Sequence, residues 1–562
     1  MVFNTMNIAC AQRINVADYG AVPDTHKDAV PAIKRAIAAC RKLTRPVLYF
    51  PKGQYDLYPD SAEKREYFLS NTTSETECPS KIKTIGILLE GIKDLTIDGN
   101  GSMLMYHGRM ITFALDHSSR ITIQNLEEDY ERPTMSEFTI TNVTPESIQI
   151  QVHPDSWYRL DDGKLSWYGE GWVAQNSFCI RIDSSTGAMY YANDEYTALS
   201  KMQVKEDAPM HLSFQGNVDT SKYHAGDVYT IRDPNRDEVG LLILNSRDVT
   251  LKEVAMHYMH GLGILSQFSG NITMRSVGIL PRKGSGRRIA SFADGMHFSG
   301  CKGSINIEQC VFTGLHDDAI NVHGTHLKII KRPSDRTMVV RFMHPQTYGF
   351  QAFWPGDSVA FVHPATLAIY NYSVVKDIQR LSDREWLLTM NKPTSAASDD
   401  VVENITWTPS LTVRRNVITG TQTRGMLVTT RRKVIIEDNT FYRVGMHAIL
   451  IADDALSWYE SGPVKDVTIR RNAFTLCGHN ILPNAYVIAI APENHQLTDT
   501  PVHHNIRIVN NTFDLLGAGV VSARSVQGLS IKDNSIKRGD KNKWFHQEAC
   551  KNVTISNNQY IQ

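Results

Sequence analysis

The sequence predicts an all-β protein, a right-handed parallel β-helix with two small antiparallel β-barrel domains inserted into it. Three observations support this fold class: a repeat with a step of 23 or 24 residues, two stretches that interrupt the repeat, and an amphipathic segment near the N-terminus. A repeat of this length is typical of solenoids, in which each unit buries its apolar face only against its neighbours.

The repeat consists of a short strand, two polar residues and an asparagine. Its clearest copies are LTVRRN at 411, VIIEDN at 434, VTIRRN at 467, IRIVNN at 506, LSIKDN at 529 and VTISNN at 553. Less regular relatives occur earlier, from LTIDGN at 95 to INIEQC at 305. Because successive coils of a parallel β-helix lie about 4.8 Å apart, a residue type that recurs at one corner forms a ladder along the axis.

The recurring asparagines are expected to form such a ladder. They are Asn416, Asn439, Asn472, Asn511, Asn534 and Asn558. Asparagine tolerates the left-handed backbone conformation that a sharp bend needs, and its amide can hydrogen-bond to the same amide one coil away. Cys310 takes this position in INIEQC, and we expect it to fill the ladder there.

Two stretches without the repeat alternate apolar and polar residues between turns, which is typical of antiparallel strands. Each is long enough for a small β-barrel, and both leave and rejoin the solenoid near its acidic coils, where they could wall a pocket. The expected domains are 11–131 (N-terminal cap and first coils), 132–230 (first inserted barrel), 231–324 (central coils with the acidic residues), 325–405 (second inserted barrel) and 406–562 (C-terminal coils).

The N-terminal segment VADYGAVPDTHKDAVPAIKRAIAAC predicts a helix that covers the open end of the solenoid. Asp28 is expected to cap this helix, whose apolar face includes Ile33, Ala36, Ile37 and Cys40. Covering the end protects the first strands against pairing with other chains. The pattern resembles the start of the pectate-lyase and polygalacturonase superfamily, which agrees with the predicted fold class.

Composition excludes several classes of partner. The chain has 59 basic and 59 acidic residues, so it lacks the charge excess typical of proteins that bind nucleic acid or anionic lipid. No run approaches the ~18–20 apolar residues that a membrane span requires. The eight cysteines form no CxxC pair, which excludes the common zinc spacings.

Acidic residues gather where two consecutive coils align. Aligning DGMHFSG, DAINVHG, RGMLVTT and HAILIAD yields one column that faces away from the packed interior, with Asp317 beside it. The column contains Asp294, Asp318, Arg424 and His447. Like charges on adjacent coils repel each other, so stability alone gives no reason to keep three acids together. The pattern favours a functional site, with a solvated ladder of unrelated side chains as the alternative.

Clustered carboxylates suit glycoside hydrolysis. One protonated acid donates to the leaving oxygen, and another carboxylate attacks the sugar or activates water. Crowding separates the pKa values of the acids, because neighbouring carboxyls cannot all ionise easily. The same oxygen atoms could instead bind calcium. A calcium-dependent polysaccharide lyase therefore stays open as an alternative, as does a glycan-binding solenoid without catalysis.

The segments ADGMHFSGCKG, GLHDDAINVHG, TRGMLVTTRR and SWYESGPVKDVTIRRNAF resemble the exo-α-1,3-galactosidases of glycoside hydrolase family 110, and the resemblance extends over nearly the whole chain. It implies an inverting hydrolase that removes terminal galactose from blood-group-B-type glycans without a metal or another cofactor. It also implies that the catalytic residues are drawn from Asp294, Asp317 and Asp318. Whether linear Galα1-3Gal is accepted besides the branched, fucosylated epitope stays open.

Polygalacturonases share this layout of acids, so a polygalacturonase-like hydrolase on the same fold is a further alternative, and by that analogy Asp317 is the general acid while Asp294 and Asp318 hold the water. The sequence departs from the polygalacturonase pattern, however, since no Arg-Ile-Lys triplet follows and the nearby His323–Gly324 pair lies too close to Asp318. The roles of the three acids therefore stay open.

Several other residues are candidates for substrate binding. They are Arg424, Trp458, Glu460, His297, His323 and Asn321, and Asn235 and Arg236 are expected at a pocket rim. Trp458 and Tyr459 could stack on the apolar face of galactose, whereas packing of their loop on the solenoid is the alternative. For Arg424 and Glu460 the alternative is a surface ion pair, and for each histidine it is a structural role.

The expected partner is an oligosaccharide or glycoconjugate with terminal α-1,3-galactose, without nucleic acid or a membrane span, and a homo-oligomer stays open. We expect a secreted or periplasmic bacterial protein, mainly because of this function. The start, MVFNTMNIACAQ, lacks the basic region of a signal peptide, but its small residues resemble the end of a trimmed one.

Overall fold

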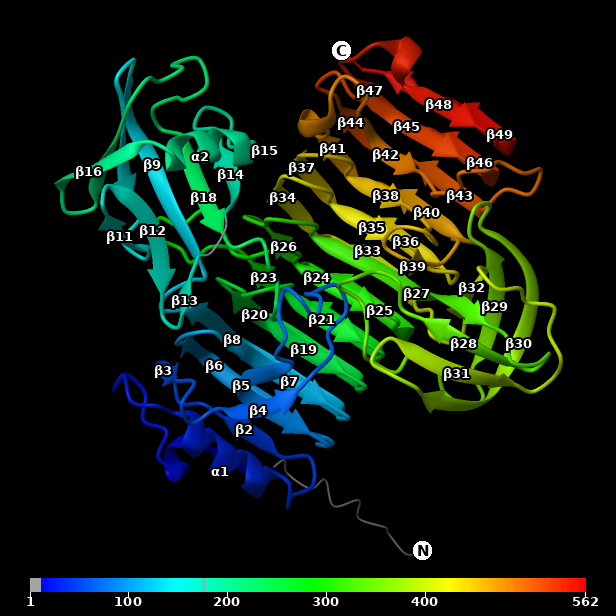
Figure 1. The fold of residues 1–562 in the computed structure, drawn as a ribbon, viewed down its shortest axis with the longest axis horizontal. Helices are drawn as coiled ribbons and strands as arrows, with labels where there is room; N and C mark the ends of the chain where they lie inside the picture. The colour runs from blue at the N-terminus through cyan, green and yellow to red at the C-terminus, as the bar shows by residue number, and fades with distance from the viewer. Residues whose placement is uncertain (1–11, 175–176, 562) are drawn as a thin grey trace, which may run out of the picture.

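The computed structural model describes residues 12–174 and 177–561. The chain winds into a parallel β-helix whose coils follow one another from the N-terminal to the C-terminal end (Figure 1). Nearly all of the segment in which a signal was considered, MVFNTMNIACAQ, lies outside the described residues. None of the helices within the described ranges has the length and apolar character of a membrane-crossing helix.

Each complete coil contributes three short strands, so the solenoid has three parallel ladders. The first ladder comprises β5 (Ile82–Glu90), β7 (Ile111–Asp116), β19 (Leu241–Leu244), β21 (Ile264–Gln267), β24 (Met296–Ser299), β27 (Ile320–Lys331), β35 (Met426–Val428), β38 (Ile449–Ile451), β42 (Tyr486–Ile490), β45 (Gly519–Arg524) and β48 (Phe545–Glu548). This ladder carries the candidate site.

The second and third ladders complete the coils. The second comprises β1 (Arg13–Asn15), β2 (Val47–Tyr49), β6 (Thr96–Tyr106), β8 (Ser119–Tyr130), β20 (Arg247–Met256), β22 (Gly270–Arg275), β25 (Lys302–Glu308), β33 (Ser410–Arg414), β36 (Val434–Glu437), β40 (Val467–Arg470), β43 (His503–Val509), β46 (Val526–Lys532) and β49 (Lys551–Ser556). The third comprises β3 (Gln54–Leu57), the later parts of β6, β8 and β20, then β23 (Gly278–Ile279), β26 (Val311–Phe312), β34 (Val417–Thr421), β37 (Thr440–Val444), β41 (Ala473–Thr475), β44 (Thr512–Asp514), β47 (Ser535–Lys537) and β50 (Gln559–Tyr560).

The interior of the solenoid is an apolar core in which equivalent side chains stack from coil to coil. Phe441, Phe474 and Phe513 are fully buried, and each neighbouring pair of rings is stacked with centroids 4.9 Å apart. Stacked aromatic rings contribute beyond the area that they bury. The repeat therefore stabilises the coils through identical neighbours, as the sequence predicts.

The asparagine ladder is confirmed. The side-chain amide of Asn416 donates to Asn439 Oδ1 at 2.9 Å, and the chain of bonds continues to Asn558. Cys310 extends the ladder by donating its backbone N–H to Asn416 Oδ1 at 2.8 Å. The expected left-handed conformation is wrong for the ladder asparagines, because it belongs to the residue before each of them, such as Arg415. The bend turns one residue earlier and thereby points the amide inward.

Helix α1 (Val30–Cys40) lies across the N-terminal end of the solenoid (Figure 1). Its predicted apolar face is confirmed, since Ile33 and Ala36 are fully buried. The predicted cap needs a correction: the N-cap residue is Ala29, which has no capping side chain, although Asp28 Oδ1 accepts from Val30 N–H at 3.0 Å.

The first insertion follows β8 and forms an antiparallel sheet of seven strands in the order β15-β14-β18-β9-β10-β17-β16, with a three-stranded sheet beside it. Its elements are β9 (Met135–Thr144), β10 (Ser147–Val152), β11 (Trp157–Asp161), β12 (Lys164–Gly169), β13 (Trp172–Val173), β14 (Phe178–Ile182), β15 (Met189–Tyr191), α2 (Asn193–Ser200), β16 (Gln203–Ala208), β17 (His211–Gln215) and β18 (Val228–Arg232). It has its own apolar core around Phe138 and Trp167.

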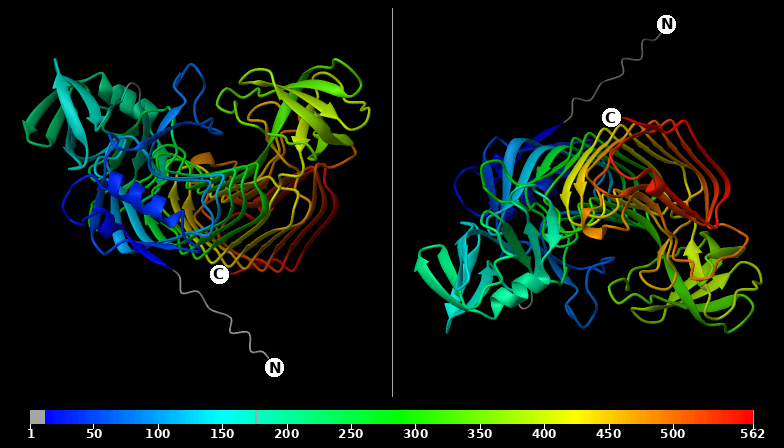
Figure 2. Two further views of the ribbon diagram at one scale, coloured as in Figure 1. Left: turned by 90° about the horizontal axis from the view of Figure 1, so that it is seen from below. Right: turned by 90° about the horizontal axis from the view of Figure 1, so that it is seen from above.

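The second insertion is a closed antiparallel barrel, because β27 pairs with both β28 and β32 and the remaining strands complete the ring. Its strands are β28 (Thr337–Arg341), β29 (Ser358–His363), β30 (Ala368–Arg380), β31 (Glu385–Met390) and β32 (Val401–Asn404). Strand β27 starts as a strand of the solenoid and continues as a wall of the barrel. Figure 2 shows the two insertions on the same side of the solenoid, with a segment of the N-terminal part (blue) between them.

Candidate active site

The parallel register of the first ladder brings the acidic residues together. The register partners in successive coils are Met296 of β24, Ile320 of β27, Met426 of β35 and Ile449 of β38. The residues two positions before these partners are Asp294, Asp318, Arg424 and His447, which is the column that the sequence alignment predicts. Gly295 N–H donates to Asp318 O at 2.8 Å, so the pairing extends toward the acids.

The column faces away from the solenoid interior and is nevertheless shielded from solvent. Asp294 is 3% exposed and Asp318 is 1% exposed, which contradicts the alternative of a solvated ladder. A loop between β4 (Glu63–Glu66) and β5 reaches across the site. This loop is held at both sides, because Ser70 N–H donates to Gln267 Oε1 at 2.8 Å and Thr72 N–H donates to Gln346 O of the second insertion at 3.2 Å.

The predicted residues line a narrow cavity of about 180 Å³, which we call the inner cavity. Those that line it are Asp294, Asp317, Asp318, His297, Asn321, Arg424, Trp458 and Glu460. His323 does not line it and contacts His297 from behind. Leu427 and Leu450 add an apolar wall, because they share the register of Asn321. Acidic groups facing an apolar wall are suited to a sugar, which has both polar and apolar surfaces.

Asp318 and Asp317 each have an arginine partner. Arg424 donates to Asp318 Oδ1 through its backbone N–H at 3.1 Å and through Nε at 2.9 Å. Arg236 Nη1 donates to Asp317 Oδ2 at 3.1 Å. Burial raises the pKa of Asp318 to about 7, with a further rise from the charges of Asp317 and Asp294, although Arg424 opposes the shift. Three carboxyls in one cavity thus differ in their surroundings, as acid–base catalysis requires.

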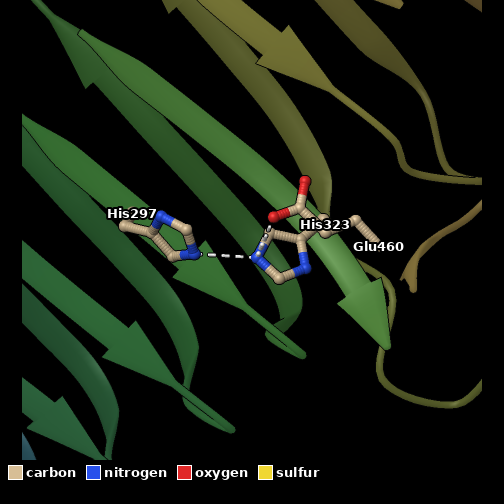
Figure 3. Close-up of side chains that lie close together, drawn as sticks. All are labelled: His297, His323 and Glu460. Atoms are coloured by element: carbon tan, nitrogen blue, oxygen red, sulfur yellow. Dashed lines mark hydrogen bonds and ion pairs between the residues drawn. The ribbon is translucent and has the colours of Figure 1, made fainter. Parts of the chain in front are cut away.

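Asp294 is joined to a pair of histidines. Its Oδ2 lies 2.7 Å from His297 Nδ1, and His297 Nε2 lies 2.7 Å from His323 Nε2 (Figure 3). Burial raises the pKa of Asp294 well above its usual value, and the charge of Asp317 adds to this rise. Burial lowers the pKa of His297, as does the neighbouring His323.

Glu460 reaches the site because β39 (Glu460–Ser461) pairs antiparallel with β27. Its Oε1 accepts from Asn71 Nδ2 at 2.6 Å and lies 3.7 Å from His323 Nε2. In the described part of the chain, His297, His323 and Glu460 form a group whose potential ligand atoms all lie within 4.8 Å of one another. These three residues are therefore the ones that could hold a metal ion.

Trp458 sits on a tight loop that is held by one carboxylate. Asp454 accepts from the backbone N–H groups of Leu456 at 2.8 Å and Tyr459 at 2.9 Å, and also from Trp458 N–H. The Trp458 ring stacks on His344 of the second insertion with centroids 4.1 Å apart. Trp458 is 40% exposed, whereas Tyr459 is 8% exposed and packs against the second insertion. Trp458 thus faces the cavity, and Tyr459 has the packing role.

A second, wider cavity of about 720 Å³ adjoins the inner one, and we call it the outer cavity. Its walls include Phe178, Tyr190 and Tyr191 from the first insertion. Asp317 and Arg236 line both cavities and therefore stand at their junction. Arg236 lies where the sequence places a pocket rim, whereas Asn235 lines a separate cavity.

Sequence reasoning missed Asn71, Asp454 and Glu493, which also line the inner cavity. Asn71 belongs to a loop without any repeat pattern, so no signal in the sequence could have placed it. Asp454 follows the strand in IADDALSWYESG, where an aspartate before a turn is a recognisable loop-holding signal. His447 belongs to the predicted column but does not line the cavity, and its Nδ1 lies 2.6 Å from Tyr486 O.

Comparisons with known proteins agree with this architecture. Residues 136–228 match the GLAA-B beta-barrel domain I model, residues 337–402 match GLAA-B beta-barrel domain II, and residues 402–562 match the right handed beta helix region. The chain is 45% identical over 553 residues to alpha-1,3-galactosidase A of Bacteroides fragilis, which covers 96% of this chain and 91% of that protein. The chain belongs to the α-1,3-galactosidase family.

Membership of the α-1,3-galactosidase family makes the chain a glycoside hydrolase, which favours this prediction over the lyase and the non-catalytic solenoid. The chain is also 36% identical to alpha-1,3-galactosidase B of Bacteroides thetaiotaomicron, with 98% of this chain and 92% of that protein covered. Among solved structures it resembles the family 28 exopolygalacturonase of Yersinia enterocolitica, with a TM-score of 0.41, 12% identity, and 98% of this chain and 79% of that chain covered.

The raised pKa of Asp318 predicts that Asp318→Asn stabilises the protein, and more at pH 8 than at pH 5. The pKa of Asp318 is about 7 in the folded protein, whereas the pKa of an aspartate in an unfolded chain is ~4. The folded state therefore binds more protons, and stability falls as the pH rises between these values. Above pH 7 the wild type buries a charge that asparagine lacks, while the asparagine oxygen can still accept from Arg424. Melting temperatures at the two pH values measure the difference.

The control for this prediction is Asp399→Asn, since the Asp399 side chain is 83% exposed. We expect the melting temperature of this variant to differ from that of the wild type by the same small amount at both pH values. A melting-temperature difference for Asp318→Asn that is equal at pH 5 and pH 8 would contradict the raised pKa.

Proposed function

We propose that the protein is an inverting exo-glycosidase of the glycoside hydrolase family 110 type, which hydrolyses terminal α-1,3-linked galactose from blood-group-B-type glycans. The observation that carries the proposal is the inner cavity, in which Asp294, Asp317 and Asp318 converge. The names of the curated relatives, alpha-1,3-galactosidase A and B, support the same substrate linkage.

The two cavities support cleavage from the chain end. The narrow inner cavity would hold the terminal galactose, with its apolar face on Trp458 or the leucine wall and its hydroxyls toward Arg424 and Glu460. The wider outer cavity would hold the rest of the glycan. In this arrangement the scissile bond lies at the junction of the cavities, so the sugar that leaves is always the last one.

The junction also supports roles for the acids. A general acid must lie beside the glycosidic oxygen, and Asp317 is the carboxyl that lines both cavities. Asp294 and Asp318 lie in the inner cavity and would hold the water on the opposite face of the sugar, and whichever of them is ionised would accept its proton. Inverting enzymes place acid and base ~6.5–9.5 Å apart, whereas residues paired on adjacent strands are only ~5 Å apart. Asp317 lies beside the column and not in it, and it is therefore the acid in this proposal.

Proton NMR of a digest tests the proposal. We expect free galactose to appear first as the β anomer, because inversion of an α linkage yields β-galactose, and to convert slowly into the equilibrium mixture. The α anomer as first product would contradict inversion, and the absence of free galactose would contradict the function. A branched B trisaccharide and linear Galα1-3Gal are digested in parallel, so that one experiment also reports specificity.

Export from a bacterial cell belongs to the same proposal. Glycoconjugates that carry terminal α-1,3-galactose are found outside cells, and an enzyme that acts on them has to reach them there. Fractionation of the source cells, with activity followed in the medium and in the periplasm, tests this part separately.

A further inference from the structure

Two imidazoles meet at the edge of the inner cavity through their Nε2 atoms. His297 on β24 and His323 on β27 approach with these atoms 2.7 Å apart, and Glu460 Oε1 lies 3.7 Å from His323 Nε2 (Figure 3). His297 and His323 are 1% and 2% exposed. Two nitrogen atoms and one carboxylate oxygen thus converge on one point beside the cavity.

Each of these groups is oriented by a partner outside the cluster. His323 Nδ1 donates to Gly324 O at 2.7 Å, since a carbonyl can only accept, so Nε2 of the neutral ring carries a lone pair. His297 Nδ1 is held by Asp294 at 2.7 Å, and Glu460 is held by Asn71 at 2.6 Å. Histidine ligands of metal ions typically donate their second N–H to a carboxylate or a backbone carbonyl.

We propose that His297, His323 and Glu460 form a binding site for a divalent transition-metal ion of the zinc type, and that such an ion inhibits the enzyme. On binding, the proton that lies between the two Nε2 atoms leaves to solvent, and the proton shared by Asp294 and His297 resides on His297 Nδ1, so that Asp294 is a carboxylate that accepts from this N–H. The ion then takes one bond from each of the three residues and keeps its fourth position open toward the inner cavity. Two histidines and one glutamate are a known ligand set for zinc with one open position.

Binding requires the ligand atoms to move, because they lie within 4.8 Å of one another and Glu460 Oε1 is 3.7 Å from His323 Nε2. Nitrogen ligands bind zinc at about 2.0–2.1 Å in a tetrahedral arrangement, which places two of them ~3.3 Å apart. The two Nε2 atoms, now 2.7 Å apart, would separate by about 0.6 Å. Imidazole nitrogen favours zinc, copper and nickel over magnesium and calcium, which prefer oxygen ligands. The site is therefore distinct from a calcium site among the three aspartates.

Inhibition follows from the place of the cluster. His297 and Glu460 line the inner cavity, so an ion bound to them occupies space next to Asp294 and withdraws Glu460 from a sugar hydroxyl. We expect the ion to compete with substrate and raise KM. The inhibition rests on the proposed function of this cavity, whereas binding of the ion does not.

Zinc chloride is titrated into the full chain after chelator treatment and gel filtration, with binding followed by calorimetry and galactose release followed separately. We expect one zinc ion per chain and a matching loss of activity. His323→Gln should weaken zinc binding by more than the ~10–100-fold that loss of an outer partner costs. His447→Gln is the matched control, because this histidine lies two coils away from His323 and outside the inner cavity, and it should bind zinc like the wild type.

The outcomes separate the parts of the proposal. Zinc binding weaker than about 1 mM in the wild type, or equal binding by wild type and His323→Gln, overturns the site. Suppose that zinc binds to the wild type and not to His323→Gln, and that the wild type with bound zinc still releases galactose at its normal rate. This result overturns the inhibition alone. If His323→Gln does not fold, the visible absorption of Co²⁺ bound to the wild type decides, since a tetrahedral site with two nitrogen ligands gives an intense band and an octahedral oxygen site gives a weak one.

Discussion

Asp317→Asn is expected to lower kcat for a natural glycan by about 10²–10⁴-fold, the usual contribution of a general acid or base. The loss should be much smaller for 4-nitrophenyl α-galactoside, because nitrophenolate leaves without a proton. Asp318→Asn should instead lower kcat by similar factors for both substrates, because activation of water is required whatever the leaving group. Steady-state kinetics of the two variants on the two substrates measure the pattern.

Asp399→Asn is the control for these two variants, since this exposed residue on the second insertion lines neither cavity, and it should keep wild-type kinetics. The assignment of Asp317 as the acid is contradicted if Asp317→Asn loses the same factor on both substrates while Asp318→Asn is selectively rescued. The site would not be catalytic at all if full activity were kept by each of the three variants Asp294→Asn, Asp317→Asn and Asp318→Asn.

Asn472→Ala is expected to lower the free energy of unfolding by about 3–5 kcal/mol, because it leaves several buried polar groups unpaired at ~1–3 kcal/mol each. Asn472 Oδ1 accepts from Asn439 N–H at 3.0 Å and Asn439 Nδ2 at 2.9 Å. Its Nδ2 donates to Ile436 O at 2.9 Å and to Asn511 Oδ1 at 3.0 Å. Water cannot replace these bonds, since Asn472 is 2% exposed. Urea unfolding followed by circular dichroism measures the loss.

Asn558→Ala is the matched control at the C-terminal end of the same ladder. Asn558 accepts from Asn534 N–H at 3.1 Å and from Asn534 Nδ2 at 2.8 Å, but it is only partly buried, so water can take over part of its bonds. We expect a loss of about 1 kcal/mol, the net value of an ordinary hydrogen bond. Equal losses for the two variants would show that the ladder does not depend on burial.

The sequence predicted the column of Asp294, Asp318 and Arg424 because the repeat itself sets the register. A step of one coil brings each residue next to its equivalent, and parallel pairing propagates this neighbour relation along the whole axis. The same reasoning found the asparagine ladder and the place of Cys310 in it. It assigned the left-handed bend to the wrong residue, because the repeat shows which positions recur and not which of them carries the turn.

The residues that complete the cavity could not be predicted in the same way. Asn71 meets Glu460 across 389 residues, and Arg236 meets Asp317 across 81 residues. These contacts join irregular loops, for which no period relates one residue to another. Tyr459 was a candidate for sugar stacking beside Trp458. Only the packing of the second insertion separates their roles, because Tyr459 is buried against it and Trp458 faces the cavity.

By itself, then, the sequence determined the solenoid, its register and the meeting of acidic residues on consecutive coils. These features follow from a local period and from pairing between neighbours. Tertiary structure alone decided that Asp294 and Asp318 are buried, that Arg236 partners Asp317, and that a narrow cavity adjoins a wider one. Their physical cause is the cover built by two insertions and one loop, because it excludes water from the carboxyls and shifts the pKa of the buried ones.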